Sequence, residues 1–176
     1  MMPYTPAAIR MLESLGIPLG LVVARNLEEF AEASTLVVAE IDPAGKEHML
    51  TPTAAQAWQR LTTAASLDGV DLHIVSAFRS VKRQVDIIER KIRQGLSIEK
   101  ILEFSAPPFF SEHHTGCAID VSTAGSEDLE PEFEETDAFA WLTMHAGDYG
   151  FEMSFRINNV SGYAYEPWHW RFMEAL

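Results

Sequence analysis

Residues 111–120 constrain the fold of this chain more than any other stretch. They contain two adjacent histidines, a Thr-Gly-Cys step and an aspartate within an apolar, β-branched run. In a straight strand an offset of seven would place His113 and Asp120 on opposite faces, and the Thr-Gly-Cys step is poor helix material. The chain must therefore bend if the two side chains are to meet, and Gly116 is the residue that permits the bend. We expect a bend at Gly116 that leads into a strand carrying Asp120.

A second cluster near the C-terminus, residues 166–170, reads Glu-Pro-Trp-His-Trp. Together His113, Asp120 and His169 would make a three-ligand metal set. Such a set leaves one position open for water, as in catalytic zinc sites. Glu166 lies three residues before His169 and is the candidate base for that water. The pattern predicts a zinc hydrolase, although Glu-x-x-His alone is a weak signal.

Hydrophobic periodicity and turn residues predict the remaining elements. Helices are predicted at residues 6–15, 52–66, 81–94, 97–104 and 137–149, and strands at residues 19–23, 35–41, 72–78, 118–121, 151–155 and 168–172. Strands do not alternate singly with helices, so a doubly wound parallel sheet is not expected. The order favours an α+β fold with a mostly antiparallel central sheet flanked by helices.

Length and charge narrow the class of protein. A chain of 176 residues is expected to form a single domain, residues 1–176. Its net charge of -13 argues against nucleic acid or an anionic membrane surface as the main partner. No run of about 18 apolar residues predicts a membrane span. The first six residues lack the basic and apolar regions of a secretory signal, so the sequence as it stands predicts a cytoplasmic protein. A periplasmic or extracellular protein whose signal had been trimmed would look the same.

Several other residues have simpler interpretations. The segment 126–137 holds seven acidic residues but lacks EF-hand spacing, so a solvated loop is expected rather than a calcium site. His114 should point away from the metal set, and the single cysteine, Cys117, is expected to be a small buried residue. The other three histidines are expected to be packed or surface residues: His48, His73 and His145.

Taken together, these motifs resemble the VanY-type zinc D-Ala-D-Ala carboxypeptidases, within the wider group of lysostaphin-type peptidases and Hedgehog domains. The first motif is Ser-x-His-x-x-Gly-x-Ala-x-Asp at residues 111–120, and the second is Tyr-Glu-Pro-Trp-His at residues 165–169. A third, Ser-Ala-Phe-Arg-Ser at residues 76–80, resembles the arginine-bearing segment of the family. The resemblance covers roughly residues 50–172 and leaves residues 1–48 outside it.

The resemblance implies a Hedgehog/D-Ala-D-Ala peptidase-like fold, one zinc ion and a set of site residues. The implied metal ligands are His113, Asp120 and His169; the catalytic residues are Glu166 and Arg79; the substrate-binding residues are Gln84, Ser111, Trp168 and Tyr165. Two places depart from the family pattern, His114 and the loop at residues 156–161. Both affect substrate preference more than chemistry.

The expected activity is hydrolysis of the peptide bond before a C-terminal D-alanine in peptidoglycan stem peptides or their fragments. The alternative is a non-catalytic module that uses zinc to hold cell-wall peptides. The sequence leaves open whether the residue before the scissile bond is D or L, whether the substrate is a dipeptide or a full stem, and which oligomeric state the protein adopts.

Overall fold

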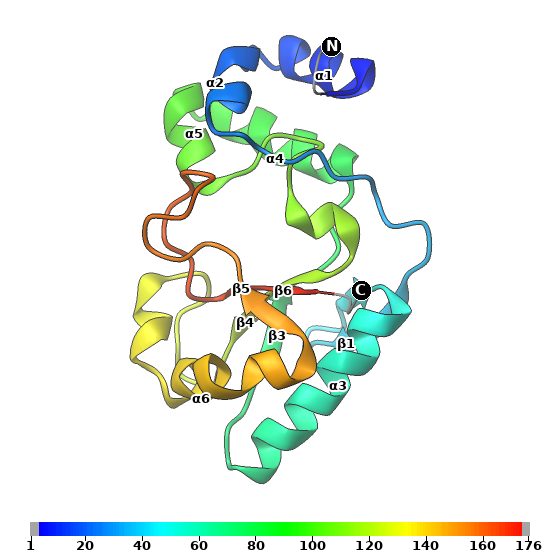
Figure 1. The fold of residues 1–176 in the computed structure, drawn as a ribbon, viewed down its shortest axis with the longest axis vertical. Helices are drawn as coiled ribbons and strands as arrows, with labels where there is room; N and C mark the ends of the chain where they lie inside the picture. Colours follow the sequence, from blue (N-terminus) through cyan, green and yellow to red (C-terminus); the bar gives the residue numbers. More distant parts are fainter. Residues whose placement is uncertain (1–3, 174–176) are drawn as a thin grey trace.

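The computed structural model describes residues 4–173 (Figure 1). The helices are α1 (Pro6–Ser14), α2 (Leu19–Ala24), α3 (Pro52–Leu67), α4 (Val81–Arg93), α5 (Ile98–Phe104) and α6 (Asp137–His145). The strands are β1 (Val37–Ile41), β2 (Glu47–Leu50), β3 (His73–Ser76), β4 (Ala118–Ser122), β5 (Phe151–Met153) and β6 (His169–Phe172). Three short 3-10 turns are η1 (Glu112–Thr115), η2 (Pro131–Glu135) and η3 (Ala146–Tyr149). Among the described residues no helix is long and apolar enough to cross a membrane.

The strands form a four-stranded antiparallel sheet and a separate hairpin. The sheet has the order β3-β4-β6-β5, and β1 pairs with β2 in the hairpin. The expected α+β fold with an antiparallel sheet is confirmed. Within the sheet Asp120 of β4 lies directly opposite His169 of β6. This register brings two residues 49 positions apart in the sequence onto neighbouring strands.

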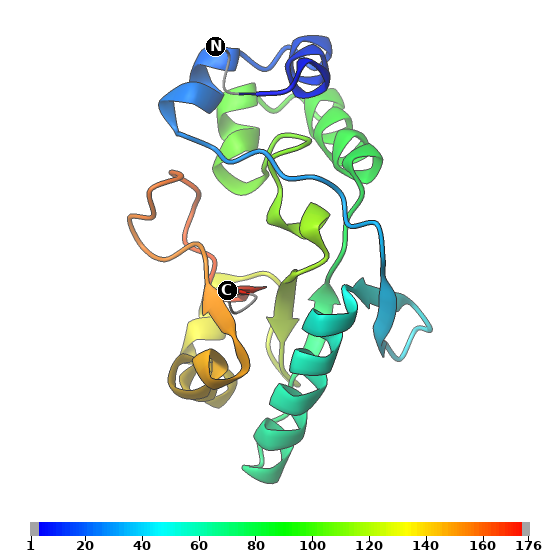
Figure 2. The ribbon, with the colours of Figure 1, turned by 45° about the vertical axis from the view of Figure 1, so that its right-hand side comes forward.

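Two hydrophobic cores divide the molecule into halves (Figures 1 and 2). In the sheet half, α3 and α6 pack around the four-stranded sheet, with Trp58, Phe133 and Phe151 among the fully buried side chains. In the helical half, α1 and α2 pack on α4 and α5 through residues such as Leu12 and Ile88. The described residues before β1 therefore belong largely to the helical half.

Three local predictions need correction. Residues 19–23, predicted as a strand, form the helix α2, because Val22 is fully buried in the helical core while Val23 is about half exposed. Tertiary packing overrides the weak β preference of such a short run. The strand β2 was not predicted; it follows the turn at residues 42–45 and buries alternate side chains. The segment 126–137 is not all solvated loop, because η2 buries Phe133.

The chain between α2 and β1 runs along the loop that precedes the metal-ligand motif (Figure 2). The Phe30 amide donates to the Phe109 carbonyl at 2.7 Å, and the Ala33 amide donates to the His114 carbonyl at 2.8 Å. The segment 30–33 thus ties residues outside the family resemblance to the loop that carries His113.

Candidate metal centre

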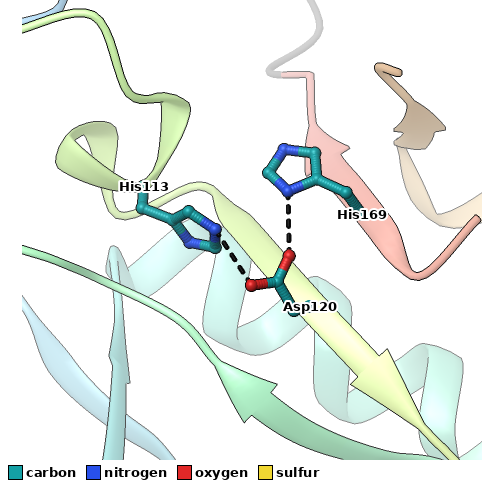
Figure 3. A group of neighbouring side chains, drawn as sticks. All are labelled: His113, Asp120 and His169. Atoms are coloured by element: carbon teal, nitrogen blue, oxygen red, sulfur yellow. Dashed lines mark hydrogen bonds and ion pairs between the residues drawn. The ribbon is translucent and has the colours of Figure 1, made fainter. Parts of the chain in front are cut away.

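Three buried side chains converge beside the middle of β4 (Figure 3). His113 comes from η1, Asp120 from β4 and His169 from the start of β6. Their candidate ligand atoms all lie within 4.8 Å of one another. The cross-strand register places Asp120 beside His169, as described above. The structure brings together the three residues that the sequence predicts as metal ligands.

The predicted bend delivers His113 to this group. Residues Glu112–Thr115 form a 3-10 turn, and Gly116 follows in the left-handed conformation with φ 66°. A Cβ at this position would lie 2.8 Å from the Leu36 side chain, in addition to requiring a backbone conformation that other residues rarely adopt. The backbone conformation therefore favours glycine here, and a larger residue would also have to displace the Leu36 side chain. β4 begins two residues later with Ala118.

Each histidine has one ring nitrogen held by an acceptor outside the group. His113 Nδ1 lies 2.8 Å from the Ala77 carbonyl, and His169 Nε2 lies 2.9 Å from Glu112 Oε2. A proton on each of these nitrogens leaves His113 Nε2 and His169 Nδ1 directed at Asp120, at 3.2 and 2.9 Å. Such outer hydrogen bonds fix the tautomer of metal-binding histidines.

In the absence of metal, a proton on His169 offsets the negative charge of Asp120 within the buried group. Burial opposes a negative charge on Asp120, but the two imidazoles hold its pKa well below the usual range. Burial lowers the pKa of His169, and the hydrogen bonds to Asp120 and Glu112 outweigh it and raise that pKa to about 10. A divalent cation would take the place of this proton. Two imidazole nitrogens and one carboxylate are a donor set that suits zinc, so the residues present fit such an ion.

Glu112 contacts the metal group and was not identified from the sequence. Burial would raise its pKa, but His169 and Ser154 lower it to about 2. The Ser154 hydroxyl donates to Glu112 Oε2 at 2.6 Å, and an Arg171 Nη1 lies 3.4 Å from Oε1. Glu112 therefore orients the His169 ring from the side away from Asp120. The adjacency of an acid to His113 was the only signal in the sequence.

The metal group opens into a cleft of about 750 Å³, which Glu166 also lines. Burial raises the pKa of Glu166 to about 7, and the carboxylates of Asp120 and Glu112 add to this rise. His169 and Arg79 act in the opposite direction. A carboxyl group with a pKa near neutrality is suited to take up and release a proton.

Arg79 also lines the cleft and is held in place by its neighbours. Its Nη1 donates to Gln84 Oε1 and its Nη2 donates to Ser76 Oγ, both at 3.0 Å. The same Nη2 lies 3.9 Å from Asp120 Oδ2. Burial lowers the pKa of Arg79 from its usual value, although a guanidinium keeps its charge at neutral pH. A fixed positive charge therefore lies beside the metal group.

Comparison with known proteins agrees with this arrangement. Residues 47–175 match the family model VanY: D-alanyl-D-alanine carboxypeptidase. The chain belongs to the VanY family. A curated relative, the bifunctional D-Ala-D-Ala dipeptidase and D-Ala-D-Ala carboxypeptidase VanXYC of Enterococcus gallinarum, is 33% identical over 130 residues, which are 70% of this chain and 67% of VanXYC.

Two further comparisons extend the likeness. The protein YodJ of Bacillus subtilis is 33% identical over 150 residues, 81% of this chain but only 54% of YodJ. The solved structure of the LdcB LD-carboxypeptidase superposes with a TM-score of 0.72 and 31% identity, over 80% of this chain and 69% of LdcB. This chain thus spans about half of YodJ and two thirds of VanXYC.

Of the four residues predicted to bind substrate in this VanY-family chain, three line the cleft and one does not. Ser111, Trp168 and Tyr165 line the cleft. Burial and a hydrogen bond to Glu134 raise the pKa of Tyr165 to about 12, so its hydroxyl stays protonated at neutral pH. Gln84 does not line the cleft; it is fully buried, and its amide donates to the Ala106 carbonyl while its oxygen accepts from Arg79. The geometry supports a role for Gln84 in positioning Arg79 rather than in contacting substrate.

The remaining predicted side chains lie outside the metal group. His114 is fully buried and points away from it, bonded through Nδ1 to the Arg79 carbonyl at 2.6 Å and through Nε2 to the Phe109 amide at 3.2 Å. It therefore joins two loops of the site without reaching the ligand atoms. Cys117 is partly buried, 3.6 Å from the Thr51 hydroxyl.

Proposed function

We propose that this protein is a zinc-dependent carboxypeptidase that hydrolyses the peptide bond before a C-terminal D-alanine in peptidoglycan stem peptides or their fragments. The observation that carries the proposal is the placement of Glu166, with its pKa of about 7, in the same cleft as the buried group His113, Asp120 and His169. Three ligands and a nearby base are what metal-assisted hydrolysis needs.

Zinc is the proposed ion, held by His113 Nε2, His169 Nδ1 and a carboxylate oxygen of Asp120. When bound, it supplies an acidified water and polarises the scissile carbonyl. A D,D-pentapeptidase VanY of the same fold was solved in complex with Zn(II), with a TM-score of 0.60 and 23% identity. The donor set of this chain supports the same choice of ion.

Glu166 acts as the proton carrier in the proposed reaction. Its carboxylate takes a proton from the attacking water and then gives it to the leaving amine of D-alanine. A pKa near 7 allows both transfers at neutral pH, because neither the carboxylate nor the carboxylic acid is strongly disfavoured.

Arg79 is proposed to stabilise the negative oxygen that develops on the scissile carbonyl. Its guanidinium is fixed by Gln84 and Ser76 before substrate arrives, so little reorganisation accompanies the reaction. Ser111, Trp168 and Tyr165 are proposed to contact the substrate, since they line the same cleft.

The alternative is a module that binds cell-wall peptides through zinc without cleaving them. A base with a raised pKa is not needed to hold a ligand, and this favours the enzyme. The deciding experiment incubates the zinc-loaded protein with peptides ending in D-Ala-D-Ala or L-Lys-D-Ala and measures released D-alanine, with and without a chelator. Chelator-sensitive release supports the enzyme; binding without release of D-alanine supports the module.

A further inference from the structure

The charged residues of α4 are sorted onto different faces of the helix. The helix carries seven charged side chains, two of them carboxylates. Asp86 pairs with Lys82 at 3.5 Å, and Glu89 pairs with Arg93 at 3.4 Å. Both carboxylates therefore form ion pairs with cations one turn away along the helix. Three cations of α4 remain: Arg83, Arg90 and Lys91.

These three cations share the face of α4 that lines the cleft. Together with Ile87 they occupy positions i, i+4, i+7 and i+8, which follow one side of a helix. Over the described residues 4–173, none of the three has a carboxylate within ion-pair distance. From Arg83 to Arg90 the stripe extends about 10 Å along the helix, two turns.

Lys91 is the most enclosed of the three. Its Nζ donates to the Ser105 hydroxyl at 2.6 Å, which fixes the ammonium at the edge of the cleft. Burial lowers its pKa, the nearby cations Arg90 and Arg79 add to that effect, and the Glu166 carboxylate opposes it. A carboxylate bound beside these three cations would relieve their mutual repulsion.

The position of this stripe is notable in a protein with a net charge of -13. The acidic residues that line the cleft come from β2, from the segment 126–137 and from the surroundings of the metal centre, not from α4. One wall of the cleft is therefore positive while the surface as a whole is negative. Local potentials of this kind select ligands by charge.

We propose that Arg83, Arg90 and Lys91 form a subsite for a second carboxylate of the peptide substrate, upstream of the scissile bond. The inference rests on the proposed function and names its substrate class: peptides that end in D-alanine and carry an acidic residue before the cleaved pair. A cleft of about 750 Å³ falls in the range that takes ligands of several residues. A stripe of about 10 Å matches about three residues of extended chain.

The test compares two sets of peptides that share the same D-Ala-D-Ala end. Each set places glutamate, or the neutral isostere glutamine, at one, two or three residues before the cleaved pair. The zinc-loaded protein is assayed for kcat/KM, and a Glu166→Gln protein is assayed for peptide binding by calorimetry. An exposed cation–carboxylate contact contributes up to about fivefold. We expect glutamate to be preferred by about three- to tenfold at one position of the panel at low salt, and the preference to shrink in high salt.

Matched variants locate the preference on the helix. Arg83→Gln/Arg90→Gln and Lys91→Met each remove charge while keeping most of the side-chain stem, and we expect them to lower the glutamate preference towards one. The control, Lys82→Gln/Arg93→Gln, removes the same charge as the double variant from the paired cations of α4, and should retain the preference. Thermal unfolding of each variant checks that the fold is intact.

Three results would overturn the inference. One is an equal loss for glutamate and glutamine peptides in the cleft-face variants, which would mean that the stripe binds the terminal carboxylate common to both. Another is no preference in the wild type. The third is an equal effect of the control variant, which would indicate general charge rather than a subsite. Absence of cleavage for all peptides would instead count against the proposed function, and the binding arm would still decide this inference.

Discussion

The two halves of the molecule contribute different kinds of side chain to the cleft. The sheet half supplies the buried His113, Asp120 and His169, fixed by strand register and by hydrogen bonds behind each imidazole. The helical half supplies Arg83, Arg90 and Lys91, for which the described residues offer no carboxylate within ion-pair distance; Lys91 bonds to Ser105. Buried and paired groups suit chemistry, which needs fixed geometry. Exposed charges suit selection of a ligand, because each contributes little and can adapt.

The largest effect should come from the sheet half. Glu166→Gln keeps the shape of the side chain but removes the proton carrier, so kcat should fall by about 10²- to 10⁴-fold. Steady-state assays with a D-Ala-D-Ala peptide measure this, and elemental analysis should still find one zinc per chain. A variant that hydrolyses as fast as wild type would remove the base assignment.

The next effect concerns the stability of the helical half. Leu12 is fully buried between α1 and its neighbours, so Leu12→Ala should cost about 2–5 kcal/mol of unfolding free energy. Denaturant titration measures the cost. Zinc affinity of the folded variant should be unchanged, because no ligand lies in this core. The surface variant Glu13→Ala of the same helix is the control, and a matching loss of zinc affinity would show that the halves are not separable in this way.

A smaller effect is expected from the residue behind His169. Glu112→Gln keeps an acceptor but removes the charge that holds the Nε2 proton, so zinc affinity should fall by about 10- to 100-fold. Competition with a chromogenic chelator measures it. Glu152→Gln, an exposed position on β5, is the matched control. Unchanged zinc affinity in Glu112→Gln would limit Glu112 to a packing role.

The last effect is a dependence of stability on pH that metal should reverse. In the metal-free protein the pKa of His169 is about 10, above its ordinary 6.5, so its stabilising contribution is complete below pH 6.5 and is lost as the pH rises towards 10. The slope cannot exceed about 1.4 kcal/mol per pH unit for one proton. Zinc affinity should rise over the same interval, because the ion displaces that proton.

Thermal unfolding from pH 7.5 to pH 9.5, above the pKa of Glu166 and below that of His169, with chelator and with zinc, separates these two trends. The chelated protein should lose stability with rising pH, and the zinc-induced gain should grow. His169→Asn should abolish the alkaline loss in the chelated protein. A chelated wild type whose stability is flat over this interval would contradict the shared proton.

Much of the metal centre was accessible from the sequence because its residues lie in short, dense motifs. The bend at Gly116 was predicted because an offset of seven in a straight strand would put His113 and Asp120 on opposite faces. The antiparallel sheet was predicted from the order of helices and strands. The role of Glu112 was not predictable, since it depends on which face of a 3-10 turn meets β6. Gln84 was assigned to substrate by resemblance, whereas its burial directs it to Arg79.

The helical half was less predictable for a physical reason. Residues 19–23 have the composition of a strand, but they form a helix that buries Val22 in the core shared with α4 and α5. The cleft face of α4 was not predicted either. Which charges pair along the helix depends on side-chain placement, and the sequence pattern does not determine this.

The segment between α2 and β1 has a practical consequence for dissecting this protein. The Phe30 ring lies over the Arg171 guanidinium, with 4.8 Å between the Arg171 Cζ and the ring centroid. Arg171 in turn contacts Glu112, which bonds to His169. A fragment cut at residue 47, where the family match begins, would uncover Arg171 and expose Ile88 and its neighbours to water. Expression of the matched region by itself would therefore yield an aggregation-prone polypeptide in which His169 is held less firmly. A shortened version of the protein should keep α1 and begin before it.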